Sequence, residues 1–247
     1  MQDHSLASLR SVDRWFGSHR AVQNVSFAVD AGAIVGVLGA NGAGKSTLMK
    51  LIAGWFPVSA GEIRIGDSLI KPNRSHSRRK ALLLVEPQSM DAAVLRELGT
   101  VLSDYNIDRA SIEQEAADWF ERFGILSCYS RNLRELSRGQ QFKVSLVGLF
   151  LIRPLVWLLD EPYACGLDAE GIAILEQEIK SHVAGGGVVF FSTQWPAHAR
   201  HLASEVMVLD EGKLVHHRPI SDPVDESLLA SAPSALRAVI DGINDNE

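Results

Sequence analysis

The sequence predicts an α/β fold built on a mostly parallel sheet, with a β-rich N-terminal part and a helical insertion. Two observations predict it. Short apolar runs alternate with stretches of helical spacing, which is typical of strand–helix–strand units in a parallel sheet. From about Ser89 to Ile152 the apolar runs give way to helical spacing alone. We therefore expect a helical subdomain inserted into the sheet.

Apolar and β-branched runs predict the strands. In the first thirty residues two such runs flank a turn at Gly17-Ser18. The run Ala33–Leu38 (AIVGVL) is continuous and ends at glycine, as expected of a fully buried parallel strand. In chain order the strands are predicted at Leu6–Val12, Ala21–Val29, Ala33–Leu38, Glu62–Ile65, Leu82–Val85, Leu155–Leu159, Val188–Ser192 and Val206–Leu209.

Helical spacing of apolar residues predicts the helices, and glycine or proline follows several of them as a stop signal. Pro196 is placed to open a further short helix. The longer helices are predicted at Lys45–Ala53, at Glu113–Phe123 with Ser111 ahead of it, at Gln140–Ile152 and at Glu170–Ala184.

Composition excludes several function classes. The 247 residues include 30 acidic and 24 basic side chains, so the formal net charge of −6 argues against a nucleic-acid partner. Two cysteines, Cys128 and Cys165, are too few for a disulfide scaffold and indicate a reducing compartment. The longest nearly apolar run, Leu146–Ile152, is far short of the roughly 20 residues that cross a bilayer. We expect a soluble, cytoplasmic protein without a signal peptide.

A glycine-rich loop follows the buried strand and precedes a helix. Its sequence, GANGAGKST, fits the pattern GxxxxGK[ST], in which small residues let backbone N–H groups close around phosphate oxygens. Lys45 is expected to reach the β- and γ-phosphates, and the Ser46 hydroxyl to ligate Mg²⁺. The loop therefore predicts a site for a nucleoside triphosphate. Its nucleotide-binding residues are Gly39, Asn41, Gly42, Ala43, Gly44, Lys45, Ser46 and Thr47.

Two adjacent carboxylates follow the apolar run Leu155–Leu159. Asp160 stands where a second Mg²⁺ contact is needed, and Glu161 is placed to polarise the attacking water as a general base. An acidic pair that ends a strand is common in isolation, but it carries more weight after a phosphate loop.

The segment Leu136–Gln140, LSRGQ, resembles the LSGGQ signature of ATP-binding-cassette (ABC) ATPases and lies between the two phosphate motifs in the order that this family uses. The resemblance covers about Leu6–Leu214. It implies a P-loop NTPase core with an N-terminal antiparallel β subdomain and a helical insertion subdomain. It also implies head-to-tail pairing with a second ABC ATPase subunit, which is a second copy or a paralogue. In such a pair the ATP site of the partner subunit is completed in trans by Ser137, Gly139 and Gln140.

The same resemblance assigns further residues. Phe16 corresponds to the aromatic side chain that stacks on adenine, although it could be an ordinary strand residue and Trp15 competes for the role. Gln88 corresponds to a catalytic glutamine that touches Mg²⁺ and water, with a surface turn as the alternative. Cys165-Gly-Leu-Asp168 resembles the loop through which two such subunits touch.

Two positions depart from the family pattern. Arg138 replaces the third signature residue, which is glycine in the family. The substitution is tolerable if the backbone amides bind the phosphate and the arginine side chain points outward. Gln194 replaces a histidine that contacts the γ-phosphate, and an amide can donate a hydrogen bond but cannot carry a proton. The change is either a tolerated substitution or a cause of slow hydrolysis, and we do not expect His198 to substitute for the missing histidine.

We expect the ATPase subunit of an ABC transporter that uses ATP and Mg²⁺. The ABC ATPase domain would span residues 1–220, with the helical subdomain at about 89–151, and an acidic C-terminal extension would follow at 221–247. The partner would be a separate integral-membrane permease, which places the chain at the inner face of the cell membrane. Export is favoured because no long regulatory domain follows. The alternative is a soluble ABC ATPase that acts as an assembly factor or scaffold.

Weaker features suggest no further site. The basic cluster Arg74–Lys80 is interpreted as a solvated loop, because no aromatic residues interleave with it. The histidine pairs His198 with His201 and His216 with His217 lack the cysteines or carboxylates of a metal site.

Overall fold

The computed structural model describes residues 5–72, 80–84, 94, 102, 105, 107, 109–221 and 241. Gln88, residues 74–79 of the basic cluster and all of the extension except residues 221 and 241 lie outside this set. The chain forms two compact units. The first unit comprises Met1–Leu83, Leu155–Pro162 and Ser181–Glu247, and the second comprises Leu84–Pro154 and Tyr163–Lys180.

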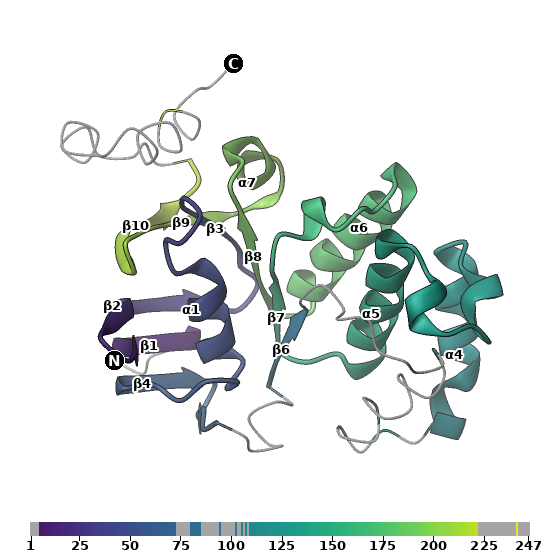
Figure 1. Ribbon diagram of the computed structural model, residues 1–247, viewed down its shortest axis with the longest axis horizontal. Coiled ribbons are helices and arrows are strands. Elements are labelled where there is room, and N and C mark those ends of the chain that lie inside the picture. The colour runs from purple at the N-terminus through teal and green to yellow at the C-terminus, as the bar shows by residue number, and fades with distance from the viewer. Residues whose placement is uncertain are drawn as a thin grey trace. The chain divides into compact units, whose positions relative to one another are not determined.

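A six-stranded sheet forms the centre of the first unit, in the order β10-β9-β3-β8-β7-β6 (Figure 1). β3 pairs in parallel with β8 and β9, and β7 pairs in parallel with β8, whereas β9 and β10 are antiparallel. The mostly parallel sheet that the sequence predicts is therefore confirmed. The strands are β3 (Ile34–Leu38), β6 (Ala81–Leu84), β7 (Val156–Leu159), β8 (Val188–Thr193), β9 (Glu205–Asp210) and β10 (Lys213–Pro219).

A second sheet, antiparallel and four-stranded, has the order β2-β1-β4-β5. Its strands are β1 (Ser5–Phe16), β2 (His19–Asp30), β4 (Ala60–Ile65) and β5 (Ser68–Leu69). β1 and β2 are each longer than predicted, because pairing continues through polar residues such as Arg14 and Arg20 up to the turn at Gly17. The expected antiparallel N-terminal subdomain is present.

The central strands are buried on both faces. Every residue of β3, β7 and β8 is buried, which explains their unbroken apolar runs. Helix α1 (Lys45–Ile52) follows β3, and α7 (Pro196–Leu202) packs against β3. At the C-terminal end of α6 (Ala169–Ala184), the imidazole of His182 stacks on Trp157 with ring centroids 4.2 Å apart. Burial lowers the pKa of His182.

The second unit is helical in its described part. It contains α4 (Arg109–Arg122), α5 (Arg138–Ile152), most of α6 and the short 3₁₀ helices η1 (Leu126–Cys128) and η2 (Leu133–Glu135); η3 (Pro162–Ala164) lies where the chain re-enters this unit. Phe150 of α5 packs between Trp119 and Phe123, with ring centroids at 4.8 and 6.1 Å. The helical insertion that the sequence predicts is thus observed.

Candidate functional site

The glycine-rich loop joins the end of β3 to the start of α1, the position that the sequence predicts. Gly44 precedes the helix with φ of 101°, and a Cβ at this residue would lie 2.7 Å from the carbonyl oxygen of Ala21. Glycine is therefore required both by the backbone conformation and by the neighbouring strand. Asn41 and Gly42 are exposed at the turn of the loop, whereas Ala43 is buried.

Lys45 lies underneath this loop. Its side chain is buried, and Nζ donates hydrogen bonds to the carbonyl oxygens of Gly39 at 2.8 Å and Ala40 at 3.2 Å. Burial lowers the pKa of Lys45, while the negative charges of Glu161 and Asp160 act in the opposite direction. Ser46 and Thr47 form the first turn of α1 together with Lys45 and are partly buried.

Ser192 of β8, which is fully buried, bonds to both acidic residues that follow β7. The Ser192 hydroxyl donates to Asp160 Oδ1 at 2.6 Å, and the Glu161 backbone N–H donates to Ser192 Oγ at 2.9 Å. Glu161 has a φ of 50°, a left-handed conformation that is uncommon for a glutamate. Sequence reasoning missed Ser192; the available signal was a serine at the end of an otherwise apolar strand.

Two predicted side chains, Lys45 and Gln194, converge on one carboxylate oxygen of a third, Glu161. Glu161 Oε1 lies 3.8 Å from Lys45 Nζ and 3.4 Å from Gln194 Nε2. His198 lies instead beside Thr193, with 3.3 Å between its Nδ1 and the threonine Oγ1. The phosphate loop, the carboxylate pair and Gln194 are therefore assembled within the first unit.

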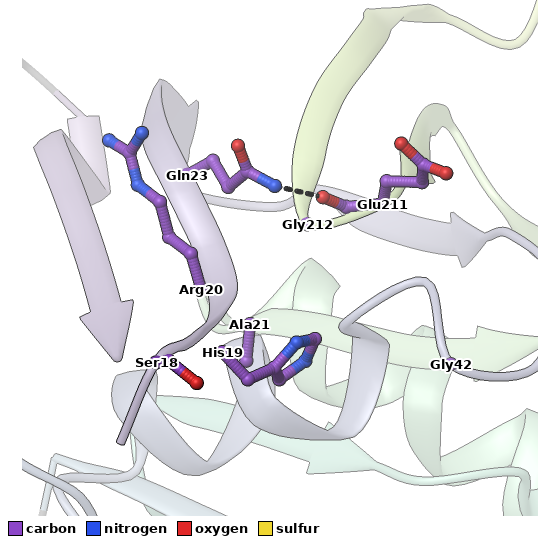
Figure 2. A pocket seen from close by; sticks show the side chains of 8 residues that line it. All are labelled: Ser18, His19, Arg20, Ala21, Gln23, Gly42, Glu211 and Gly212. Atoms are coloured by element: carbon purple, nitrogen blue, oxygen red, sulfur yellow. Dashed lines mark hydrogen bonds between the residues drawn. The ribbon is translucent and has the colours of Figure 1, made fainter. Parts of the chain in front are cut away.

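A cavity of about 330 Å³ borders the loop at Gly42 (Figure 2). His19, Arg20 and Ala21 from the start of β2 line it, together with the turn between β9 and β10. The Gln23 amide donates a 2.6 Å hydrogen bond to the backbone oxygen of Glu211, which joins these two parts of the wall. Apart from Gly42, none of the lining residues was predicted from the sequence.

The two aromatic candidates at the end of β1 are both exposed. The guanidinium of Arg14 lies 4.4 Å from the centroid of the Phe16 ring, and Phe56 packs against that ring at 5.3 Å. Trp15 is faced by Arg20, 5.3 Å from its ring. The assignment of base stacking to Phe16 rather than Trp15 stays a prediction.

The signature segment lies in the second unit, at the start of α5. The Ser137 hydroxyl accepts the N–H of Gln140 at 3.2 Å, and the Gln140 side chain accepts the N–H of Ser137 at 2.9 Å, which forms a capping box. Arg138 is exposed, in line with the expected outward side chain. Gly139 is buried, and a Cβ there would collide with the carbonyl oxygen of Gly166.

The loop Cys165–Asp168 ends at α6, where Asp168 caps the helix. Asp168 Oδ1 accepts the N–H of Gly171 at 2.8 Å, and Oδ2 accepts a 2.8 Å hydrogen bond from Lys143 Nζ. The bond from Lys143, followed by that from Gly171, lowers the pKa of Asp168. Cys165 is buried, as expected of a small residue that contributes to packing.

A glycine-rich loop between a central parallel strand and a helix, with carboxylates at the end of a neighbouring strand, defines the fold of a P-loop nucleoside triphosphatase. Residues 22–164, more than half of the chain, match the family described as ABC transporter. The chain therefore belongs to the ABC transporter family, as an ATP-binding subunit. Proteins of this family hydrolyse ATP and couple hydrolysis to transport.

Relatives within the family are named for different directions of transport. The chain is 30% identical to the cytochrome c biogenesis ATP-binding export protein CcmA of Idiomarina loihiensis, over 78% of this chain and 88% of that protein. It is 32% identical to the molybdenum import ATP-binding protein ModC of Mycobacterium tuberculosis, over 90% of this chain and 62% of that protein.

A solved structure of the ATP-binding subunit of an ABC transporter matches with a TM-score of 0.85 and 24% identity, over 96% of this chain and all of that one. Because the identity is low, this likeness supports the fold alone. In the part of the chain that the structure describes, no helix is both long and apolar enough to cross a membrane.

Proposed function

We propose that this chain is the ATP-hydrolysing subunit of an ABC transporter and drives export through a separate membrane permease. The observation that carries the proposal is the convergence of Lys45 and Gln194 on one oxygen of Glu161, beside the glycine-rich loop. A phosphate cradle, a candidate general base and two nitrogen donors lie close together there. This set is what attack of water on a γ-phosphate requires.

The residues of the first unit divide the chemistry among them. Backbone N–H groups of the loop bind the phosphate oxygens, and Lys45 turns from the loop carbonyls towards the β- and γ-phosphates when ATP is bound. Glu161 accepts the proton of the attacking water. Gln194 donates to Glu161 or to the γ-phosphate, and Gln88 would contribute a further contact to water.

The residues also fit a magnesium ion. The Ser46 hydroxyl and the Asp160 carboxylate are hard oxygen donors, and Gln88 could supply an amide oxygen. Among the residues that the structure describes, no cluster of three or more histidine, cysteine or acidic side chains could hold a metal by protein ligands alone. That is consistent with Mg²⁺, which is usually held by one or two protein groups together with phosphates and water. When bound, the ion would neutralise charge on the phosphates.

The remainder of the nucleotide has two candidate contacts. Phe16 is exposed at the end of β1 and would stack on adenine. The cavity beside Gly42 lies next to the phosphate loop, so His19 and Arg20 are within the region where a sugar or base could reach. We propose this cavity as part of the nucleotide site.

The site is completed by a second ABC ATPase subunit, either another copy or a paralogue. Ser137, Gly139 and Gln140 begin a helix, and the N-terminus of a helix attracts negative charge. We propose that this helix start meets the γ-phosphate of ATP held by the partner, and that the loop Cys165–Asp168 touches the partner too.

The proposal also covers the direction of transport, which is export, and the location of the chain at the membrane. Support for export comes from the match to CcmA, named as an export protein, over 88% of its length. The chain would lie at the cytoplasmic face of the membrane, bound to the permease. We propose an ABC ATPase domain over residues 1–220 with a helical subdomain at about 89–151, followed by an extension at 221–247, and no nucleic-acid partner.

A second candidate function is an ABC ATPase that works as an assembly factor or scaffold without a permease. Purification in detergent from the native membrane separates the two. Recovery of a stoichiometric hydrophobic subunit supports the transporter, and its repeated absence under mild detergent supports the alternative.

Replacement of Glu161 tests the enzymatic assignment. Glu161→Gln keeps the shape of the side chain but removes the base, so we expect the hydrolysis rate to fall by about 10²–10⁴-fold. Binding of a fluorescent ATP analogue should stay within about twofold of wild type, since a general base adds little to substrate binding in the ground state. Hydrolysis near the wild-type rate would contradict the role of Glu161, and loss of binding would contradict the division of roles.

A further inference from the structure

Lys143 on α5 is a buried charged side chain for which the proposed function has no role. It is 7% exposed, and its Nζ donates to Asp168 Oδ2 at 2.8 Å and to the Phe123 carbonyl oxygen at 3.0 Å. We propose that Lys143 is a positioning residue, which fixes the loop Cys165–Asp168 against the signature segment so that both meet a second copy of the chain in one arrangement. This inference rests on the proposed function, because it requires ATP-driven pairing.

The contacts along α5 support this role. Gly139 and Lys143 are four residues apart, so they lie on the same face of the helix. Gly139 approaches the carbonyl oxygen of Gly166 so closely that any side chain would collide with it. Lys143 bonds to Asp168, two residues further along the same loop. The loop is therefore held at two points, once by backbone contact and once by charge.

Asp168 extends the link to the next helix. Its second oxygen, Oδ1, accepts the N–H of Gly171 in the first turn of α6 at 2.8 Å. The Lys143 stem covers the same turn, because its Cε lies 3.0 Å from the position of a Cβ at Gly171. One lysine thus joins the start of α5, the loop and the start of α6 within the second unit.

The exposure of the two partners allows positioning to be separated from folding. The Asp168 side chain is 61% exposed, whereas that of Lys143 is 9% exposed. Loss of the lysine charge would leave a solvated carboxylate rather than a buried unpaired one, which is the costly case. Lys143→Met keeps an unbranched apolar stem and should fold, although it also loses the bond to the Phe123 carbonyl oxygen. It removes one of the two contacts that hold the loop to α5.

The experiment measures ATP-driven dimerisation in a background with Glu161→Gln, which slows hydrolysis. Analytical ultracentrifugation with ATP and Mg²⁺ gives the dimer dissociation constant, and a fluorescent ATP analogue at low protein concentration gives the affinity of the monomer. Arg122→Met is the matched control. It removes the 2.9 Å ion pair between Arg122 of α4 and Glu178 of α6, which lies away from the loop.

We expect Lys143→Met to weaken dimerisation by about tenfold, the effect of one lost charge-assisted hydrogen bond, with unchanged nucleotide affinity of the monomer. Lys143→Arg should restore most of the loss, and Arg122→Met should have no effect. Unchanged dimerisation in Lys143→Met, or loss of its cooperative thermal unfolding, would overturn the positioning role. Failure of Glu161→Gln alone to dimerise with ATP would refute the pairing in the proposed function, and this inference with it.

Discussion

Ser192 is the residue whose removal tests the geometry of the site most directly. Its hydroxyl links the two acidic residues, donating to the carboxylate of Asp160 at Oδ1 at 2.6 Å and accepting the backbone N–H of Glu161 at 2.9 Å. Ser192→Ala removes both bonds without adding volume in a position with no solvent exposure. We therefore expect losses both in stability and in catalysis.

The magnitude follows from the two bonds. A hydrogen bond to a charged acceptor contributes about 1.5–3 kcal/mol, and a buried donor left without a partner costs about 1–3 kcal/mol. These effects overlap, since Asp160 and Glu161 can relax together, so we expect the free energy of unfolding to fall by about 2–4 kcal/mol. At about 2–4 °C per kcal/mol for a chain of this size, Tm should fall by roughly 5–15 °C.

The catalytic effect should exceed what stability alone predicts. Without Ser192, Glu161 loses the contact that accompanies its left-handed backbone, so its carboxylate is no longer held beside Lys45. Misplacement of a reacting group by about 1 Å can cost up to about 100-fold, so we expect kcat to fall by about 10–100-fold at a temperature where the variant is folded.

Steady-state ATP hydrolysis and calorimetry of the same preparations provide the assay. Ser204→Ala is the control, since the Ser204 hydroxyl likewise bonds to a backbone N–H and a carbonyl oxygen, both of Ile34, but not to the carboxylates. Its kcat should not change. A normal kcat in Ser192→Ala, whatever the change in Tm, would refute the reasoning that the hydroxyl positions the carboxylates.

Two further predictions concern single side chains. Gln194→His should raise kcat by about tenfold if the amide slows hydrolysis, because an imidazole can carry a proton and glutamine cannot; an equal or lower rate in single-turnover measurements would favour a tolerated substitution. Burial lowers the pKa of His182, so at mildly acidic pH the unfolded chain binds a proton that the folded chain does not. The stability that the neutral ring contributes is therefore complete above the unfolded-state pKa of about 6.5, and it is lost as the pH falls below that value. Tm should therefore drop between about pH 7.5 and 5.5 by more in wild type than in His182→Phe, and parallel Tm curves would show that His182 is not responsible.

Local features of the site were predictable because the sequence encodes them within a few residues. The phosphate loop needs glycine at Gly44 for its backbone conformation and for the close approach of β2, so the pattern and the structure agree. The capping box of Ser137 and Gln140 is equally local. The central strands were recognised because burial on both faces leaves a continuous apolar run.

Contacts between distant segments were not predictable in the same way. Ser192 lies opposite the carboxylates only because β7 and β8 pair in one register, Leu159 opposite Phe191. The cavity at Gly42 depends on Gln23 and Glu211, which are 188 residues apart. β10 was missed because its sequence, KLVHHRP, is mostly polar, as an edge strand exposed to solvent can be.

The neutral side chain at Gln194 has an electrostatic consequence for the site. Glu161 already lies 3.8 Å from the ammonium of Lys45, and the carboxylates oppose the effect of burial on the pKa of that lysine. A protonated histidine at position 194 would bring a second cation to the same carboxylate oxygen. Glutamine donates a hydrogen bond to that oxygen and carries no charge at any pH. A histidine could give a proton to the γ-phosphate whereas glutamine can donate only a hydrogen bond, so the rate of Gln194→His decides between a tolerated substitution and slow hydrolysis.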